Sequence, residues 1–230
     1  MVRLLSLMAL LPAPAEAACR LALLLALDVS SSVDGREDAL QRAGLARALT
    51  TPRVERAFLA VPGTPVALSV YEWSGRYQQH TILDWTLVDS PAALRAAAAK
   101  VAHSSRRAED FPTAMGYAIG HAAQIFDRAP DCLFRTLDIS GDGITNDGFP
   151  PALAYAHFPL ENTTVNGLAI GVGENGAALL GYFQDQVIKG PGAFVEQARD
   201  YNDFANAMQR KLLRELVPPV LGWIGDRAIP

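Results

Sequence analysis

Two kinds of hydrophobic pattern alternate along the chain. Short continuous apolar runs are typical of strands buried on both faces, whereas apolar residues that recur every three or four positions are typical of helices with one buried side. The expected strands cover residues 21–27, 66–73, 81–88, 133–139, 163–170 and 193–198. The expected helices start near Val33 and at residues 92, 113, 177 and 201, and one more lies between the fourth and fifth strands.

The order of these elements is β-α-β-β-α-α-β-α-β-α-β-α. The second and third strands are close enough in sequence to pair as a hairpin. Elsewhere, strands separated by helices predict an α/β fold with a doubly wound, mostly parallel sheet covered by helices on both faces. We expect a single domain over residues 19–216 and a loosely held tail over residues 217–230, which contain three prolines.

The first residues have the features of a secretory signal peptide. A single positive charge at Arg3 precedes residues 4–12, which are almost wholly apolar, and small residues stand at Ala15 and Ala17. We expect residues 1–18 to be removed and the protein to be exported, to the periplasm or the extracellular space. The alternative, a short buried helix, would be interrupted by prolines in this stretch.

Composition and charge narrow the possible functions. Of 230 residues, 50% are hydrophobic and 19% are charged, which excludes a mainly disordered chain. The formal net charge is −4 and basic residues are dispersed, so no nucleic-acid partner is expected. The longest basic run, Arg106 and Arg107, is typical of a solvated helix end. Beyond residue 18, no stretch has the roughly 20 apolar residues of a transmembrane helix.

Oxygen-bearing side chains follow the first and fourth strands. Asp28, Ser30 and Ser32 alternate after the first strand, so their side chains can point the same way, and Asp142 follows the fourth strand between two glycines. Hard cations such as Mg²⁺ prefer oxygen ligands of this kind. Alternatively, Ser32 is the N-cap of the next helix, and Thr113 is either an N-cap or a further hydroxyl ligand.

These motifs carry a resemblance to a known family. Asp28-x-Ser30-x-Ser32, Thr113 and Asp142-Gly143 resemble the metal-ion-dependent adhesion site (MIDAS) of von Willebrand factor type A (vWA) domains. The stretches LALDVSSSVD, YEWSG, DISGDG, NGLAIG and VIKGPGAFV are also similar to a family of uncharacterised secreted bacterial proteins with this domain.

The resemblance implies a six-stranded sheet in the order 3-2-1-4-5-6 with an antiparallel edge strand. It implies one divalent cation, Mg²⁺ or else Mn²⁺ or Ca²⁺, held by Asp28, Ser30, Ser32, Thr113 and Asp142. A partner protein would complete the coordination with a carboxylate. In this topology, Cys19 and Cys132 precede neighbouring parallel strands, so we expect a disulfide at the end of the sheet opposite the metal.

Three functions follow from these residues. We favour an exported binding domain without enzymatic activity, which recognises a protein partner through the cation. The main rival is a Mg²⁺-dependent phosphotransferase or phosphatase with Asp28 as nucleophile, although Ser30 stands where such enzymes carry an acid/base aspartate. The third is a structural domain with a vestigial metal site. The four histidines share no zinc-site spacing and are expected to be surface or packing residues.

Overall fold

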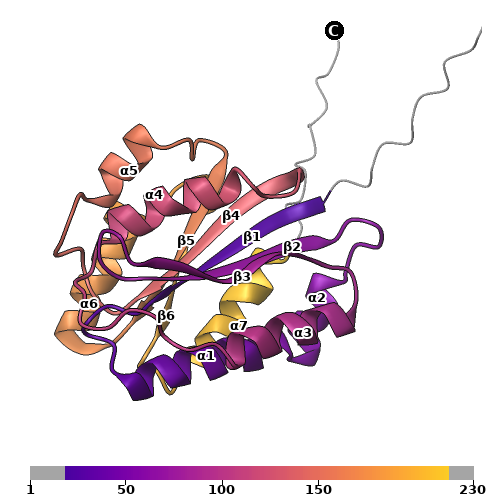
Figure 1. Cartoon of the computed structure of the whole chain (residues 1–230), viewed down its shortest axis with the longest axis horizontal. Coiled ribbons are helices and arrows are strands. Elements are labelled where there is room, and N and C mark those ends of the chain that lie inside the picture. Colours follow the sequence, from indigo (N-terminus) through magenta and orange to yellow (C-terminus); the bar gives the residue numbers. More distant parts are fainter. Residues whose placement is uncertain (1–18, 218–230) are drawn as a thin grey trace, which may run out of the picture.

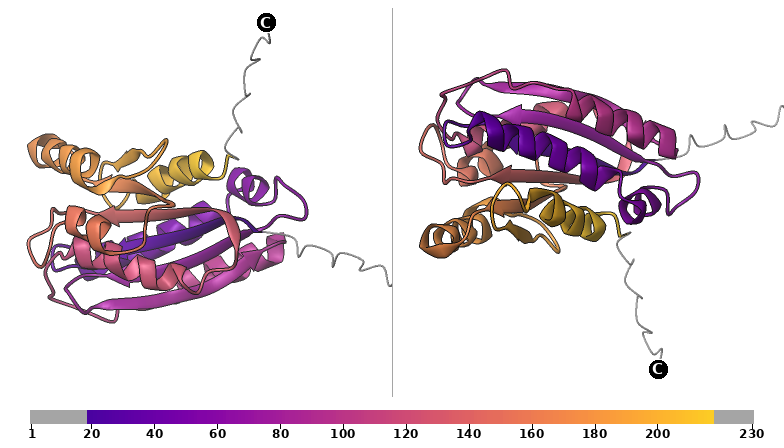
Figure 2. Two further views of the ribbon diagram at one scale, coloured as in Figure 1. Left: turned by 90° about the horizontal axis from the view of Figure 1, so that it is seen from above. Right: turned by 90° about the horizontal axis from the view of Figure 1, so that it is seen from below.

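The computed structural model describes residues 19–217 and consists of one sheet between two layers of helices (Figures 1 and 2). The strands are β1 (Cys19–Asp28), β2 (Val66–Trp73), β3 (Gln79–Val88), β4 (Cys132–Gly141), β5 (Thr163–Ile170) and β6 (Val195–Ala198). The helices are α1 (Gly35–Leu49), α2 (Pro52–Phe58), α3 (Pro91–Ala102), α4 (Met115–Phe126), α5 (Pro151–His157), α6 (Gly173–Tyr182) and α7 (Phe204–Glu215), and a π-helical turn follows α6 at Phe183–Val187. The expected signal peptide and residues 218–230 of the expected tail lie outside the described residues.

The sheet has the expected topology. The strand order is β3-β2-β1-β4-β5-β6, and all neighbours are parallel except β2 and β3, which form the antiparallel hairpin. The predicted doubly wound α/β fold with an antiparallel edge strand is therefore confirmed.

The central strand β1 divides the core into two halves. All ten of its residues are buried, and successive side chains point to opposite faces. Its four odd-numbered leucines pack in the cluster under α1, α2, α3 and α7, whereas Ala22, Leu24 and Ala26 pack in the cluster under α4, α5 and α6. A continuous apolar run is therefore required here, because both faces of the strand are covered.

Several helix boundaries differ from the sequence prediction. Helix α2 was not expected; it begins with Pro52 at its first position, where the missing N–H costs no hydrogen bond. Helix α6 starts four residues before residue 177 and passes into the π-helical turn. Helix α7 starts at Phe204, because the Asp200 carboxylate accepts a hydrogen bond from the Asp203 N–H in a preceding turn.

The expected disulfide joins the start of β1 to the start of β4. Cys19 and Cys132 are register partners with Cα atoms 4.3 Å apart, and the bond closes a sequence separation of 113 residues. It lies at the end of the sheet opposite the loops that carry Asp28 and Asp142.

A cluster of charged side chains is buried between α7 and the sheet. The Lys211 Nζ atom lies 2.9 Å from Asp138 Oδ1 on β4 and 2.6 Å from Glu215 Oε1, and none of the three side chains is more than 1% exposed. The Asn166 amide on β5 also donates to Glu215. None of the functions inferred from the sequence motifs involves this cluster.

Among residues 19–217, no helix is long and apolar enough to span a membrane.

Candidate metal centre

The loops after β1 and β4 meet because these strands are parallel neighbours. The Asp28 Oδ1 atom accepts a hydrogen bond of 2.8 Å from the Ser30 N–H, which turns the backbone at the strand end. The Ser30 and Ser32 hydroxyl oxygens are 3.2 Å apart, and the Ser32 hydroxyl donates to Asp142 Oδ1 over 2.6 Å. Val29 points into the core and is fully buried. The structure therefore brings together four of the five residues expected at the site.

The Asp28 carboxylate is buried with one oxygen unsatisfied. Its Oδ2 atom has no hydrogen-bond partner among the described residues, and a Cβ atom at Gly141 would lie only 3.0 Å from it. Burial raises the pKa of Asp28 to about 7, and the negative charge of Asp142 contributes to the same shift. A buried anionic oxygen without a partner is costly, so a cation bound beside it would remove that cost.

Thr113 is the fifth expected residue and lies beside the loop after β4. A Cβ atom built at Gly143 would lie 3.5 Å from Thr113 Oγ1, which is ordinary van der Waals contact, so the two residues are close neighbours. The Thr113 N–H donates to the Asn146 side chain, and the Thr113 carbonyl accepts from the N–H groups of Asn146 and Asp147. These bonds fix Thr113 in a buried position at the edge of the site.

Two helix-capping interpretations are wrong. Helix α1 is capped by Asp34, whose carboxylate accepts from the Glu37 N–H while the Glu37 side chain accepts from the Asp34 N–H. Ser32 is therefore not needed as a cap. Helix α4 begins at Met115 after Ala114, without a side-chain cap, because the main chain of Thr113 is bound to the loop after β4.

Three further residues lie close to the loop after β1 and were not anticipated, and two of them donate hydrogen bonds to it. Arg106, in the segment between α3 and α4, donates to the carbonyls of Val29, Val33 and, over a longer distance, Ser30. The Gln41 amide on α1 donates to the Asp28 carbonyl. Tyr201, before α7, is buried, and its hydroxyl has no hydrogen-bond partner among the described residues. Burial raises the pKa of this phenol above its ordinary value, and the neighbouring carboxylates of the site raise it further.

The position of Arg106 corrects the expectation of a solvated helix end. Its guanidinium is partly buried and also donates to the carbonyl of Ala108. The neighbouring Arg107 is exposed. Only the spatial path of the segment after α3 distinguishes the two arginines, so the sequence offered no signal for this role.

Replacing Arg106 by alanine is expected to lower the free energy of unfolding by about 2 kcal/mol, because three carbonyls of the metal loop lose a charged donor. Urea denaturation measures the change. Arg107→Ala is the matched control, since the structure shows no side-chain hydrogen bond from Arg107 and its backbone N–H bond to Glu72 is retained. Equal losses in the two variants would contradict the role of Arg106.

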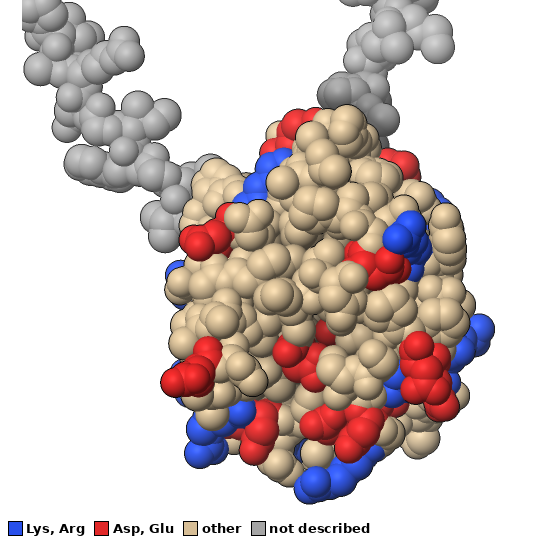
Figure 3. All heavy atoms as spheres, turned by 90° about the vertical axis from the view of Figure 1, so that its left-hand side faces the viewer, with Lys and Arg blue, Asp and Glu red and all other residues tan. Residues whose placement is uncertain are grey.

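The donor set selects for a hard cation. Within residues 19–217, no three His, Cys, Asp or Glu side chains are arranged to hold a metal ion, so a metal at this site must use the hydroxyls of Ser30, Ser32 and Thr113 together with two carboxylates. Oxygen-only sites of this kind suit Mg²⁺, Mn²⁺ or Ca²⁺. Figure 3 looks onto this end of the molecule and shows several acidic groups, most of them with basic groups nearby, separated by uncharged surface.

The geometry disfavours a phosphoryl-transfer enzyme. The Arg106 guanidinium reaches the loop after β1 but is committed to backbone carbonyls, so it is not free to hold a phosphate. Ser30, two residues after Asp28, cannot serve as a carboxylic acid/base. The arrangement can bind a cation but lacks these parts of a phosphoryl-transfer site.

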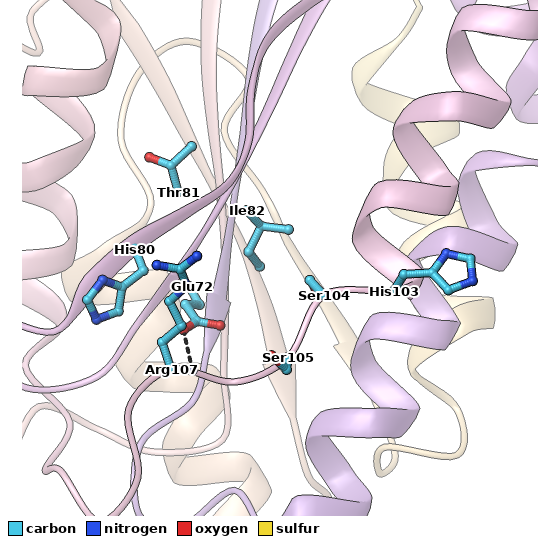
Figure 4. Close-up of a pocket in the computed structure, with 8 residues that line it drawn as sticks. All are labelled: Glu72, His80, Thr81, Ile82, His103, Ser104, Ser105 and Arg107. Carbon is cyan, nitrogen blue, oxygen red and sulfur yellow. Dashed lines mark hydrogen bonds between the residues drawn. The ribbon is translucent and has the colours of Figure 1, made fainter.

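A polar cavity of about 250 Å³ lies beside the β2–β3 hairpin, away from the candidate metal centre (Figure 4). The buried Glu72 carboxylate accepts hydrogen bonds from the Arg42 side chain and the Arg107 N–H. His80 and His103 also line the cavity but lie on opposite sides of it in the figure. Glu72 is thus already bound by protein donors, and the two histidines do not converge.

Comparison with solved structures identifies the fold. The chain resembles proximal thread matrix protein 1 from the mussel byssus, in a structure with a zinc-occupied MIDAS motif, at 16% identity and a TM-score of 0.58, covering 87% of this chain and 48% of that one. It resembles a von Willebrand factor type A protein from Catenulispora acidiphila at 18% identity and a TM-score of 0.57, covering 86% and 43%. The vWF domain of the type V pili tip protein Mfa5 from Porphyromonas gingivalis matches at 11% identity and a TM-score of 0.57, covering 91% and 99%.

This chain spans about half the length of the mussel protein. At these identities, the likeness shows the fold and not the function. No curated protein matches the sequence directly. A family model described as "Protein of unknown function (DUF1194)" matches residues 18–220. The chain therefore belongs to the DUF1194 family, and its fold is that of a vWA domain.

Proposed function

We propose that residues 19–216 form an exported, non-enzymatic binding domain that recognises a protein partner through a divalent cation. Mg²⁺ is the proposed ion. The proposed ligands, which act directly or through water, are Asp28, Ser30, Ser32, Thr113 and Asp142. A carboxylate of the partner would occupy a remaining coordination position.

The observation that carries this proposal is the unsatisfied Asp28 Oδ2 atom. It is buried beside the hydroxyls of Ser30 and Ser32 and the carboxylate of Asp142, and no other described group satisfies it. Because most of the proposed ligands are uncharged hydroxyls, the cation is less neutralised than in a site made of carboxylates. It therefore attracts an additional anionic ligand, such as a partner's Asp or Glu.

The names of the similar solved structures support a metal-dependent binding domain. One is named for a zinc-occupied MIDAS motif, and others are named as a pilus adhesin and a pili tip protein. The disulfide and the expected leader agree with export, since disulfides persist in oxidising compartments.

Asp28→Asn is expected to weaken Mg²⁺ binding at least about 100-fold. Loss of a metal ligand should reduce the metal affinity at least as much as loss of a residue that only orients a ligand. Isothermal calorimetry of the purified protein measures the affinity. Asp89→Asn is a control of the same chemistry at an exposed position outside the site. Unchanged affinity in Asp28→Asn would refute the metal site.

Mg²⁺ affinity should also rise with pH. Protons compete with the metal for Asp28, whose pKa without metal is about 7. The affinity should increase as the pH rises towards 7 and level off above it. An affinity that does not vary between pH 5 and 8 would contradict the assignment of Asp28 as a ligand.

Partner binding and enzymatic activity are separated by two further measurements. Capture of exported proteins on the immobilised domain should require Mg²⁺ and be lost with a chelator, whereas a vestigial site predicts no metal-dependent capture. Turnover of a phosphate ester that is abolished in Asp28→Asn would instead establish the phosphotransferase.

A further inference from the structure

A cavity of about 400 Å³ lies on the α4 side of the molecule, outside the candidate metal centre. Its volume is within the range of small-molecule sites. The walls come from the β2–β3 turn, helix α4, the loop after β4 and the end of α5 (Figure 1). Aromatic rings and polar side chains line the cavity.

Four aromatic rings form a continuous row along this cavity. Tyr77 meets Tyr117 edge-on at 6.1 Å between ring centroids, Tyr117 stacks on Phe149 at 4.2 Å, and Phe149 is followed by Phe158 at 6.2 Å. Tyr77, at the outer end, is 80% exposed. Such an exposed ring leaves an aromatic face free for an apolar surface.

Glycines make room for this row. A Cβ atom at Gly116 would lie 2.0 Å from the Phe149 carbonyl oxygen, and one at Gly120 would lie 2.9 Å from the Phe158 ring. Gly148 has a φ of +71°, and a Cβ atom there would lie 2.5 Å from the Tyr117 ring. Larger side chains at these positions would displace three of the four rings, so the row depends on the three glycines.

The polar groups of the cavity carry no uncompensated charge. The guanidinium of Arg76 is bound by both carboxylate oxygens of Asp147, and this contact lowers the pKa of Asp147. Burial lowers the pKa of His121, which keeps the imidazole neutral at neutral pH. An acidic peptide or a phosphate would therefore find no free cation among the groups that line this cavity.

The remaining polar groups both donate and accept hydrogen bonds. The Gln79 amide uses its nitrogen on the Gly75 carbonyl, which leaves its oxygen as an acceptor. Gln124 is an exposed amide one helical turn after the neutral imidazole of His121. An amide and a neutral imidazole each offer a donor and an acceptor, as do the tyrosine hydroxyls.

We propose that this cavity binds a neutral sugar residue, with the apolar face of the pyranose ring against Tyr77 and its hydroxyls on the amides and imidazole. A sugar hydroxyl both donates and accepts, and the C–H groups of one ring face are apolar, so a pyranose matches both sets of lining groups. A proline-rich peptide fits aromatic grooves too. It offers mainly carbonyl acceptors, however, and so would leave the acceptor groups of the cavity unused.

The test starts with a printed array of neutral oligosaccharides probed with the purified protein in the presence of chelator. Saturation-transfer NMR on the free sugars then identifies the bound ring protons. We expect binding of at least one neutral sugar. Tyr77→Ala and Gln124→Ala should each weaken it about tenfold, and both side chains are exposed, so the variants retain the fold. Leu87→Ala, an exposed apolar residue on β3, is the control and should bind normally.

The sugar site does not depend on the metal site, so Asp28→Asn should bind the sugar as the wild type does. Three outcomes overturn the proposal: no neutral sugar is bound at millimolar concentration, the affinity is unaffected by Tyr77→Ala, or a proline-rich peptide binds at Tyr77 while sugars do not.

Discussion

Replacing Lys211 by methionine is expected to lower the free energy of unfolding by about 3 to 5 kcal/mol. The Lys211 ammonium lies between two fully buried acidic side chains, at 2.9 Å from Asp138 and 2.6 Å from Glu215. Methionine keeps the length of the side chain but removes the charge. Glu215 would then be a buried anion that has lost its neighbouring cation and keeps the hydrogen bond from the Asn166 amide. Urea denaturation monitored by circular dichroism measures the loss.

Two further variants separate the charge from the packing. Lys100→Met makes the same substitution at an exposed position on α3 and should change stability by less than about 0.5 kcal/mol. A triple variant, Lys211→Met with Asp138→Asn and Glu215→Gln, removes all the charges together and should recover much of the loss, because no buried ion remains. A triple variant that is less stable than Lys211→Met would contradict an electrostatic origin.

The same cluster makes stability depend on pH. Burial and the negative charge of Glu215 raise the pKa of Asp138 to about 8 in the folded protein, above its usual value of 3.8. The folded state thus holds a proton that the unfolded chain releases. The contribution of Asp138 to stability should be complete below pH 4, decrease as the pH rises, and be lost above about 8. In Asp138→Asn this decrease should become smaller.

Removing the disulfide by Cys19→Ala with Cys132→Ala is expected to cost about 4 kcal/mol. The cross-link closes a separation of 113 residues, and constraining an unfolded loop of that size is worth about 4 to 5 kcal/mol in the chain-entropy model. Chemical denaturation of the double variant measures the change. The effect should exceed the usual 0.5 to 3 kcal/mol of single substitutions.

Wild-type protein in reducing agent is the matched control, and its stability should approach that of the double variant. Protein purified from an oxidising compartment should contain no free thiol at these two positions. Two free thiols in such a preparation would refute the cross-link.

Hydrophobic pattern predicted the sheet better than it predicted the helix ends. The central strands could be located because β1 and β2 are buried throughout on both faces, which demands mostly apolar runs. Helix starts depend instead on single hydrogen bonds. Asp34, not Ser32, caps α1, and the turn at Asp200 delays α7 to Phe204. Helix α2 has only seven residues, too few for a 3.6-residue period to be recognised.

Four of the five proposed metal ligands were visible in the sequence because they follow strands whose carboxyl ends must meet. The residues that surround them were not. Arg106 lies about 75 residues after the loop that it binds, and Tyr201 approaches from the segment before α7. The sequence around Arg106 and Tyr201 does not predict their position beside the site, because that position depends on how distant loops fold over the sheet. The aromatic row was hidden for the same reason, since its rings come from four separate segments.

The disulfide and the metal loops lie at opposite ends of the same two strands. A partner held at the metal would pull on the carboxyl ends of β1 and β4, while the covalent bond ties their amino ends. Under mechanical load, the two central strands cannot slide fully past one another. The segment between the two cysteines would be up to about 400 Å long if it were fully extended. Because the disulfide closes it into a loop, a force applied to the ends of the molecule cannot pull this segment out. The cross-link therefore limits how far the domain can lengthen under load.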